Sequence, residues 1–67
     1  MEAAQMRKAL RELDGQRNLR VEFENCRECV VNGALLIPEE DDGLVKVTDG
    51  ARVFVLDARS VHWIEIG

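Results

Sequence analysis

The sequence predicts a mainly β protein in which one N-terminal helix precedes a strongly bent, five-stranded antiparallel sheet that closes into a small barrel. Three observations lead to this fold class: an amphipathic helical pattern at the start, short apolar runs after it, and turn-forming residues between those runs. The length of 67 residues allows one domain over 1–67, with a helix at about 3–14 and strands within about 19–66. No linker, internal repeat or second domain is expected.

The first segment carries apolar side chains at helical spacing, with charged side chains on the remaining face. The apolar positions recur at intervals of three and four residues and are Ala3, Met6, Leu10 and Leu13. Gly15 follows them and suits the left-handed conformation that commonly ends a helix. We therefore predict that the helix stops near Asp14.

Two strands are predicted in the next part of the chain. Leu19–Glu24 alternates apolar and charged residues, the pattern of a strand with one buried face and one face in water. Cys29–Ile37 reads as a second, longer strand that Pro38 ends. Because a glycine inside a strand often marks a bulge or a bend, we expect Gly33 to bend this strand sharply.

Three further strands complete the predicted sheet. They are Leu44–Thr48, Val53–Leu56 and Val61–Ile66. Asp49-Gly50 is a strong hairpin signal between the first two of these, and Asp57–Ser60 turns the chain before the last. Val53–Leu56 is apolar on both faces, so we expect it to be covered on both sides.

The last two strands are predicted to join copies of the chain. One core in a chain of this size supplies only about 3–5 kcal/mol, and an uncovered apolar strand edge invites pairing with another copy. We therefore expect a homo-oligomer. The predicted interface residues are Val53, Phe54, Val55, Leu56, Val61, Trp63 and Ile64. Trp63 has an alternative role as a platform on which a nucleic-acid base stacks.

The charge balance and the apolar runs bear on partners and location. The chain has 9 basic and 13 acidic residues, a net charge of −4, which opposes non-specific binding to nucleic acid. Its longest run free of charge and proline, Cys29–Ile37, is well short of the roughly 18 residues that span a bilayer. No apolar signal-peptide core precedes the first charges. We expect an intracellular, cytoplasmic protein without membrane contact.

Two constellations invite a metal or catalytic interpretation. Cys26 and Cys29 have the spacing of half a zinc site or of a redox pair, but His62 is the one further ligand candidate where zinc needs four. Asp57, Ser60 and His62 suggest a triad, yet near neighbours on one strand project in parallel. We predict no metal, no cofactor and no enzymatic activity, with a redox pair or a zinc ion shared between subunits as the alternative for the cysteines.

The run Glu39–Asp42 places four adjacent carboxylates in the chain, and we expect no compensating bases near them. Such a run is typical of a solvated loop. The alternatives are a docking site for a basic partner or a weak calcium or magnesium site, although the spaced ligands of an EF-hand are missing.

The order of elements and parts of the sequence resemble the Sm-like family, including its bacterial Hfq branch. The segment Leu56–Ile64 looks like the second Sm signature, which has an apolar residue and Arg-Gly before a valine, an aromatic residue and an isoleucine. Val61, Trp63 and Ile64 match, whereas Asp57-Ala58 stands where Arg-Gly would be. In the first half, Val21–Asn25 and Gly33–Leu35 resemble the first signature.

The resemblance implies an Sm-like barrel that assembles into rings through its last two strands. The family binds uridine-rich RNA through an Asp and an Asn between its second and third strands, together with the Arg that is absent here. The corresponding stretch, Pro38–Gly43, has no Asn and four negative charges, and the chain has no tyrosine for the Tyr-Lys-His turn of the Hfq branch.

The predicted function is therefore a non-enzymatic, ring-forming scaffold or interaction protein without the uridine pocket. The alternative is a divergent RNA-binding ring that uses arginines on another face. Candidate contacts to RNA or to a protein partner are Arg27, Arg59 and His62.

Overall fold

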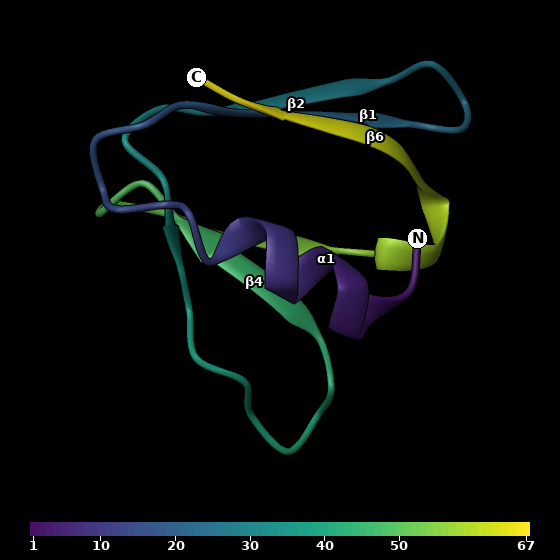
Figure 1. Cartoon of the computed structure of the whole chain (residues 1–67), viewed down its shortest axis with the longest axis horizontal. Coiled ribbons are helices and arrows are strands. Elements are labelled where there is room, and N and C mark those ends of the chain that lie inside the picture. The colour runs from purple at the N-terminus through teal and green to yellow at the C-terminus, as the bar shows by residue number, and fades with distance from the viewer.

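Two three-stranded antiparallel sheets and one helix make up the computed structural model, which describes residues 1–67 (Figure 1). In chain order the elements are α1 (Ala3–Leu10), β1 (Leu19–Phe23), β2 (Glu28–Val31), β3 (Leu35–Leu36), β4 (Val45–Thr48), β5 (Val53–Leu56), the 3-10 helix η1 (Ala58–Ser60) and β6 (Val61–Ile66). The β1 sheet has the order β2-β1-β6, and the β4 sheet has the order β3-β4-β5. In Figure 1, the β1 sheet forms one layer, and α1 and β4 lie on the other side of the core.

The mainly β class with an N-terminal helix is confirmed, but the closed five-stranded barrel is wrong. The chain has six strands, and β5 and β6 belong to different sheets, so the strands do not close on one another. The strand predicted over Cys29–Ile37 is divided into β2 and β3.

The division between β2 and β3 arises at Gly33, where a bend was predicted. Gly33 has a positive φ of 58°, and its N–H donates to the Asn18 side-chain oxygen at 3.1 Å. The Ala34 N–H donates to the Arg17 carbonyl at 2.8 Å, and its carbonyl accepts from the Gly15 N–H at 2.9 Å. The backbone here therefore bonds to the connection between α1 and β1, which separates the two sheets.

The helix is shorter than predicted. It ends at Leu10, and the N–H groups of Glu12 and Leu13 donate to carbonyls three residues back, at 3.4 and 3.0 Å, so the chain tightens out of the α-helix. The Asp14 carboxylate accepts from the Gln16 N–H at 2.9 Å and draws the chain into a turn. Leu13 nevertheless packs in the core, as its position in the apolar pattern predicts.

The core lies between the two sheets and the inner face of α1. Its buried apolar side chains are Met6, Leu10, Leu13, Leu19, Val21, Val31, Ala34, Val45, Val47, Leu56, Ala58 and Val61. The alternating patterns of β1 and β4 place Leu19, Val21, Val45 and Val47 on the inner faces. β5 departs from its prediction: Val53 and Val55 are 58% and 55% exposed, so this strand is covered on one face alone.

Candidate functional site

β5 lies at the edge of the β4 sheet, and its free side presents backbone groups as well as apolar side chains. Lys46 on β4 accepts a hydrogen bond from the Ile37 N–H at 2.9 Å, so the backbone of Lys46 faces β3. Lys46 is opposite Val55, which therefore turns its own N–H and C=O away from β4. The same holds for Val53, two residues earlier. The free edge of β5 thus offers two donors and two acceptors, at Val53 and Val55.

β6 forms an edge of the β1 sheet that also has free backbone groups, although its Ile64 and Ile66 side chains are partly buried against the core. Asn18 and Gly67 exchange two backbone hydrogen bonds of 3.0 Å, so the next pair, Leu19 and Ile66, is not hydrogen-bonded. Ile66 and Ile64 therefore direct their backbone groups away from β1. Each of the two edges thus carries a pair of branched apolar residues with free backbone groups.

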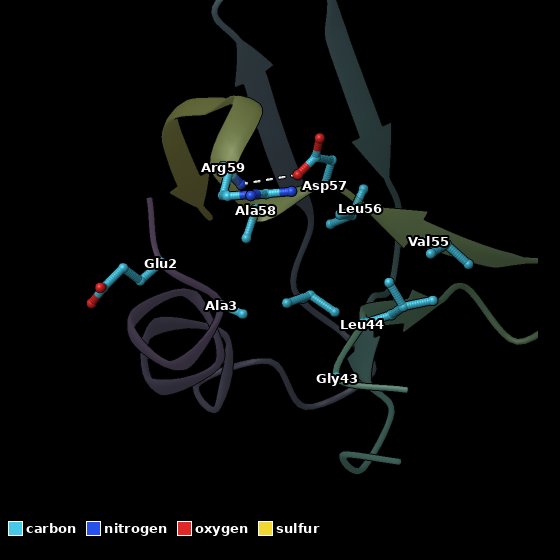
Figure 2. A pocket seen from close by; sticks show the side chains of 10 residues that line it. Glu2, Ala3, Gly43, Leu44, Val55, Leu56, Asp57, Ala58 and Arg59 are labelled. Atoms are coloured by element: carbon cyan, nitrogen blue, oxygen red, sulfur yellow. Dashed lines mark hydrogen bonds between the residues drawn. The ribbon is translucent and has the colours of Figure 1, made fainter. Parts of the chain in front are cut away.

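A first pocket lies at the end of β5, beside α1 and η1 (Figure 2). Its volume is about 540 Å³, and its apolar walls include Leu44, Val55, Ala3 and Ala58. In Figure 2, Ala3 and Ala58 approach the pocket from α1 and η1, while the Glu2 side chain points away from it. The pocket therefore offers an apolar surface with charge at its rim.

The Asp57 side chain, which lines the first pocket, closes the helical turn of η1 together with Ser60. The Asp57 carboxylate accepts from the Arg59 N–H at 3.2 Å and from the Ser60 hydroxyl at 3.1 Å. These contacts are those of a residue that caps a helical turn. His62, the third residue of the rejected triad, is exposed and lies at a bulge in β6, where the pairing with β1 shifts its register.

A second pocket, here called the Phe23 groove, separates the β1–β2 turn from the end of β5. It has a volume of about 600 Å³ and is lined by Phe23, Glu24, Asn25, Arg27, Glu28, Val55, Asp57 and Ser60. Phe23 and Val55 form its apolar part. The remainder has three carboxylates, one guanidinium, the Asn25 amide and the Ser60 hydroxyl, so acidic groups outnumber basic ones in the groove.

The predicted RNA contacts do not share a pocket. Arg27 lines the Phe23 groove and Arg59 lines the first pocket, while His62 lines neither. Arg27 is outnumbered by three carboxylates in the Phe23 groove, whereas Arg59 shares the first pocket with Asp57, since the Glu2 side chain points away.

Trp63 lies on the outer face of the β1 sheet, where it contacts Arg20. The sequence analysis did not predict this contact. The guanidinium carbon of Arg20 is 5.2 Å from the centre of the Trp63 ring, within the range of a cation–π contact. The Arg20 Nε is also 3.3 Å from Glu65 and 3.6 Å from Glu28. The available signal was the alternation of β1, which places Arg20 on its outer face, but the pairing of β1 with β6 is needed to bring the two together.

Of the predicted interface residues, Val53 and Val55 are exposed, and Phe54, Trp63 and Ile64 are partly buried. Leu56 and Val61 belong to the chain's own core. Assembly through these strands stays a prediction.

The acidic run has bases close to it in space, so the expectation of uncompensated charge is wrong. Lys46 Nζ lies 2.7 Å from carboxylate oxygens of both Glu40 and Asp42. At the base of the loop, the buried Arg7 guanidinium donates to the Ile37 carbonyl at 3.3 Å and to the Leu44 carbonyl. Arg7 lies on α1, so its sequence distance hid this contact.

These charges predict how stability responds to acid. The side-chain hydrogen bond from Lys46 holds the pKa of Asp42 below its ordinary value. A lowered folded-state pKa stabilises the fold above the unfolded value, about pH 4, and this contribution is lost as the pH falls through the folded value. We expect Lys46→Met to make the loss of stability between about pH 4 and 2 shallower.

Urea titrations across this pH range measure the effect of Lys46→Met. A smaller slope remains, because backbone N–H groups also lower the pKa of Asp14 and Asp49. Lys8→Met, on an exposed helix position, is the control and should keep the wild-type slope. Equal slopes for both variants contradict the assignment.

The two cysteines are free and differ in environment. Cys26 is exposed in the β1–β2 turn with a φ of 66°, and Cys29 lies half-buried on β2. Burial raises the pKa of the Cys29 thiol, which disfavours the reactive thiolate. Neither cysteine belongs to a cluster of three or more groups that could hold a metal ion.

Comparisons with protein families, with curated proteins and with solved structures gave no match. None of the helices has the length and apolar character needed to cross a bilayer.

Proposed function

We propose that this chain is an interaction module that assembles with copies of itself through the free edges of β5 and β6, in a ring of the Sm-like type. The observation that carries the proposal is the edge of β5. Val53 and Val55 there combine exposed apolar side chains with backbone groups turned away from β4. An uncovered edge of this kind is a template for another strand.

The edge of β6 supplies a fitting partner strand. In an antiparallel pair, residues that exchange hydrogen bonds must both direct their backbone groups toward the other strand. Val53 and Val55 are therefore placed opposite Ile64 and Ile66 of the neighbouring copy. Branched apolar pairs of this kind stabilise a sheet by up to about 1 kcal/mol each. Because β5 and β6 lie on either side of η1, each copy has one edge of each kind, and the assembly repeats from copy to copy.

Val55→Lys is the experiment that tests this proposal. Lysine on an edge strand opposes pairing, so we expect at least about a tenfold rise in the dissociation constant of the assembly. Native mass spectrometry and light scattering over a concentration series measure it. Val30→Lys is the matched control, because Val30 is 54% exposed on a strand outside the proposed interface.

A wild-type chain that is monomeric at micromolar concentration overturns the proposal. An equal loss of assembly in Val30→Lys places the contact on another strand.

The RNA-binding alternative is tested with the same preparation. The Phe23 groove around Arg27 holds three carboxylates, and Asp57 lines both pockets, which disfavours phosphate contacts. We expect oligo-uridine to bind no tighter than about 10 micromolar at physiological salt, with little salt dependence. Fluorescence anisotropy at two salt concentrations measures this. If oligo-uridine binds at nanomolar concentration, if salt weakens this binding, and if Arg27→Ala or Arg59→Ala abolishes it, the scaffold proposal is rejected in favour of the RNA-binding ring.

A further inference from the structure

The first pocket combines an apolar lining with one charge of each sign on the side of η1. The buried apolar residues of the lining are Val45, Leu56 and Ala58. Leu44 also lines it and is 43% exposed, although it lies outside every strand, so strand pairing does not account for its exposure. Asp57 and Arg59 supply the charges, and in Figure 2 both lie across the pocket from Leu44.

Two walls of this pocket are held in place by contacts within the chain. The Leu44 N–H donates to the Asp42 carboxylate at 3.0 Å, and the Leu44 carbonyl accepts from the buried Arg7 guanidinium. On the η1 side, the Asp57 carboxylate accepts from the Arg59 N–H at 3.2 Å and closes the helical turn. Walls that are already ordered reduce the entropic cost of binding a ligand.

The two charged groups on the η1 side remain available to a ligand. The Arg59 guanidinium takes part in none of the ion pairs of the chain. The Asp57 carboxylate accepts two hydrogen bonds, about half of what a carboxylate can accept. Glu2, the third charged residue of the lining, points away from the pocket in Figure 2. The pocket therefore presents one positive and one negative group beside an apolar surface.

Charge complementarity selects the class of ligand. A simple carboxylate pairs with Arg59 but leaves Asp57 without a partner, and a simple amine does the reverse. A zwitterion carries both charges on neighbouring groups, so it forms a charge-assisted contact with each residue. The pocket volume of about 540 Å³ lies within the range of about 300–1,000 Å³ that is typical of small-molecule sites.

We infer that the first pocket binds a free α-amino acid with an apolar side chain, such as leucine. The carboxylate of the ligand pairs with Arg59, its ammonium group pairs with Asp57, and its side chain contacts Leu44 and Ala58. This function goes beyond self-assembly and does not depend on it, because Asp57 and Arg59 lie outside both strand edges. Val55 lines the pocket and also belongs to the β5 edge, so the test uses variants at other positions.

Three probes with the same side chain test the inference. They are leucine, 4-methylpentanoate, which lacks the ammonium group, and 3-methylbutylamine, which lacks the carboxylate. Isothermal titration calorimetry of the wild-type chain measures their affinities, and amide chemical shifts of residues 43–45 and 57–59 locate the site. We expect leucine to bind with a dissociation constant below about 1 millimolar, and each of the other probes to bind at least about tenfold more weakly.

Two variants assign the charged groups of the ligand to their partners. Arg59→Met should remove the preference for leucine over 3-methylbutylamine. Asp57→Asn keeps a side-chain oxygen that can cap η1, and it should remove the preference for leucine over 4-methylpentanoate. Arg52→Met and Asp41→Asn make the same charge changes at exposed residues outside the pocket, and they should leave both preferences unchanged.

A lack of leucine binding, or equal binding of the three probes, overturns the inference. Leucine binding that keeps both preferences in Arg59→Met and Asp57→Asn also overturns it. Native mass spectrometry of the same samples records the assembly state independently. A failed leucine titration therefore leaves self-assembly standing, and a monomeric chain that binds leucine with these preferences rejects self-assembly alone.

Discussion

Gly33→Ala is expected to destabilise the fold by about 3 kcal/mol, the sum of a backbone cost and a steric cost. Gly33 has a φ of 58°, a left-handed conformation that costs other residues about 1–2 kcal/mol. An added Cβ would also lie 2.9 Å from the Gly15 carbonyl oxygen, which is part of the backbone and cannot rotate away. Urea unfolding monitored by circular dichroism measures the loss.

Gly43→Ala separates the two costs. Gly43 has a φ of 69°, but nothing lies within 4 Å of the position of an added Cβ. It should therefore lose just the conformational part, about 1–2 kcal/mol. Equal losses at the two glycines contradict the steric account of the bend between β2 and β3.

Arg7→Met is expected to cost about 2–4 kcal/mol, because two carbonyls lose charge-assisted hydrogen bonds. The guanidinium is buried, with 8% of the residue exposed, and it holds the Ile37 and Leu44 carbonyls at the two ends of the acidic loop. Methionine keeps the apolar stem of the side chain and removes the donors. Thermal unfolding measures the stability, and hydrogen exchange of residues 38–44 measures the loosening of the loop.

Lys8→Met is the matched control for Arg7→Met, since Lys8 is the next residue of α1 and is exposed. Its effect should stay within about 0.5 kcal/mol. The Arg7 Nε is buried without a partner, which already reduces the net stabilisation by this side chain. A loss no larger than that of Lys8→Met contradicts the clamping role.

Sequence patterns correctly predicted those strands and turns that are determined by interactions between residues close together in the chain. The bounds of β5 and β6 are those expected from their apolar runs, and Asp49-Gly50 lies in the turn between β4 and β5, with Gly50 at a φ of 96°. The alternation of apolar and charged residues in β1 also predicted correctly which of its side chains face the core. In each case the deciding interactions lie within a few residues of the pattern.

The parts that sequence reasoning missed depend on contacts between distant segments. The separation of β2 from β3 involves Asn18, 15 residues from Gly33, and Arg7 reaches carbonyls 30 and 37 residues away. The candidate edge was found because its apolar residues are adjacent, yet periodicity cannot tell whether a neighbouring element of the same chain covers Val53 and Val55. That question is decided by topology.

The pairing of β1 with β6 also governs the order in which the molecule can fold. The hairpins β1–β2 and β4–β5 are local and close quickly, whereas β6 reaches β1 from beyond the whole β4 sheet. During synthesis, β1 therefore waits with one unpaired edge until residues 61–66 have emerged. The entropy of closing that long loop is lost before the β1–β6 contacts form. The nascent chain consequently passes through a stage at which another strand can capture β1, and rapid completion of β6 limits the time available for that misassembly.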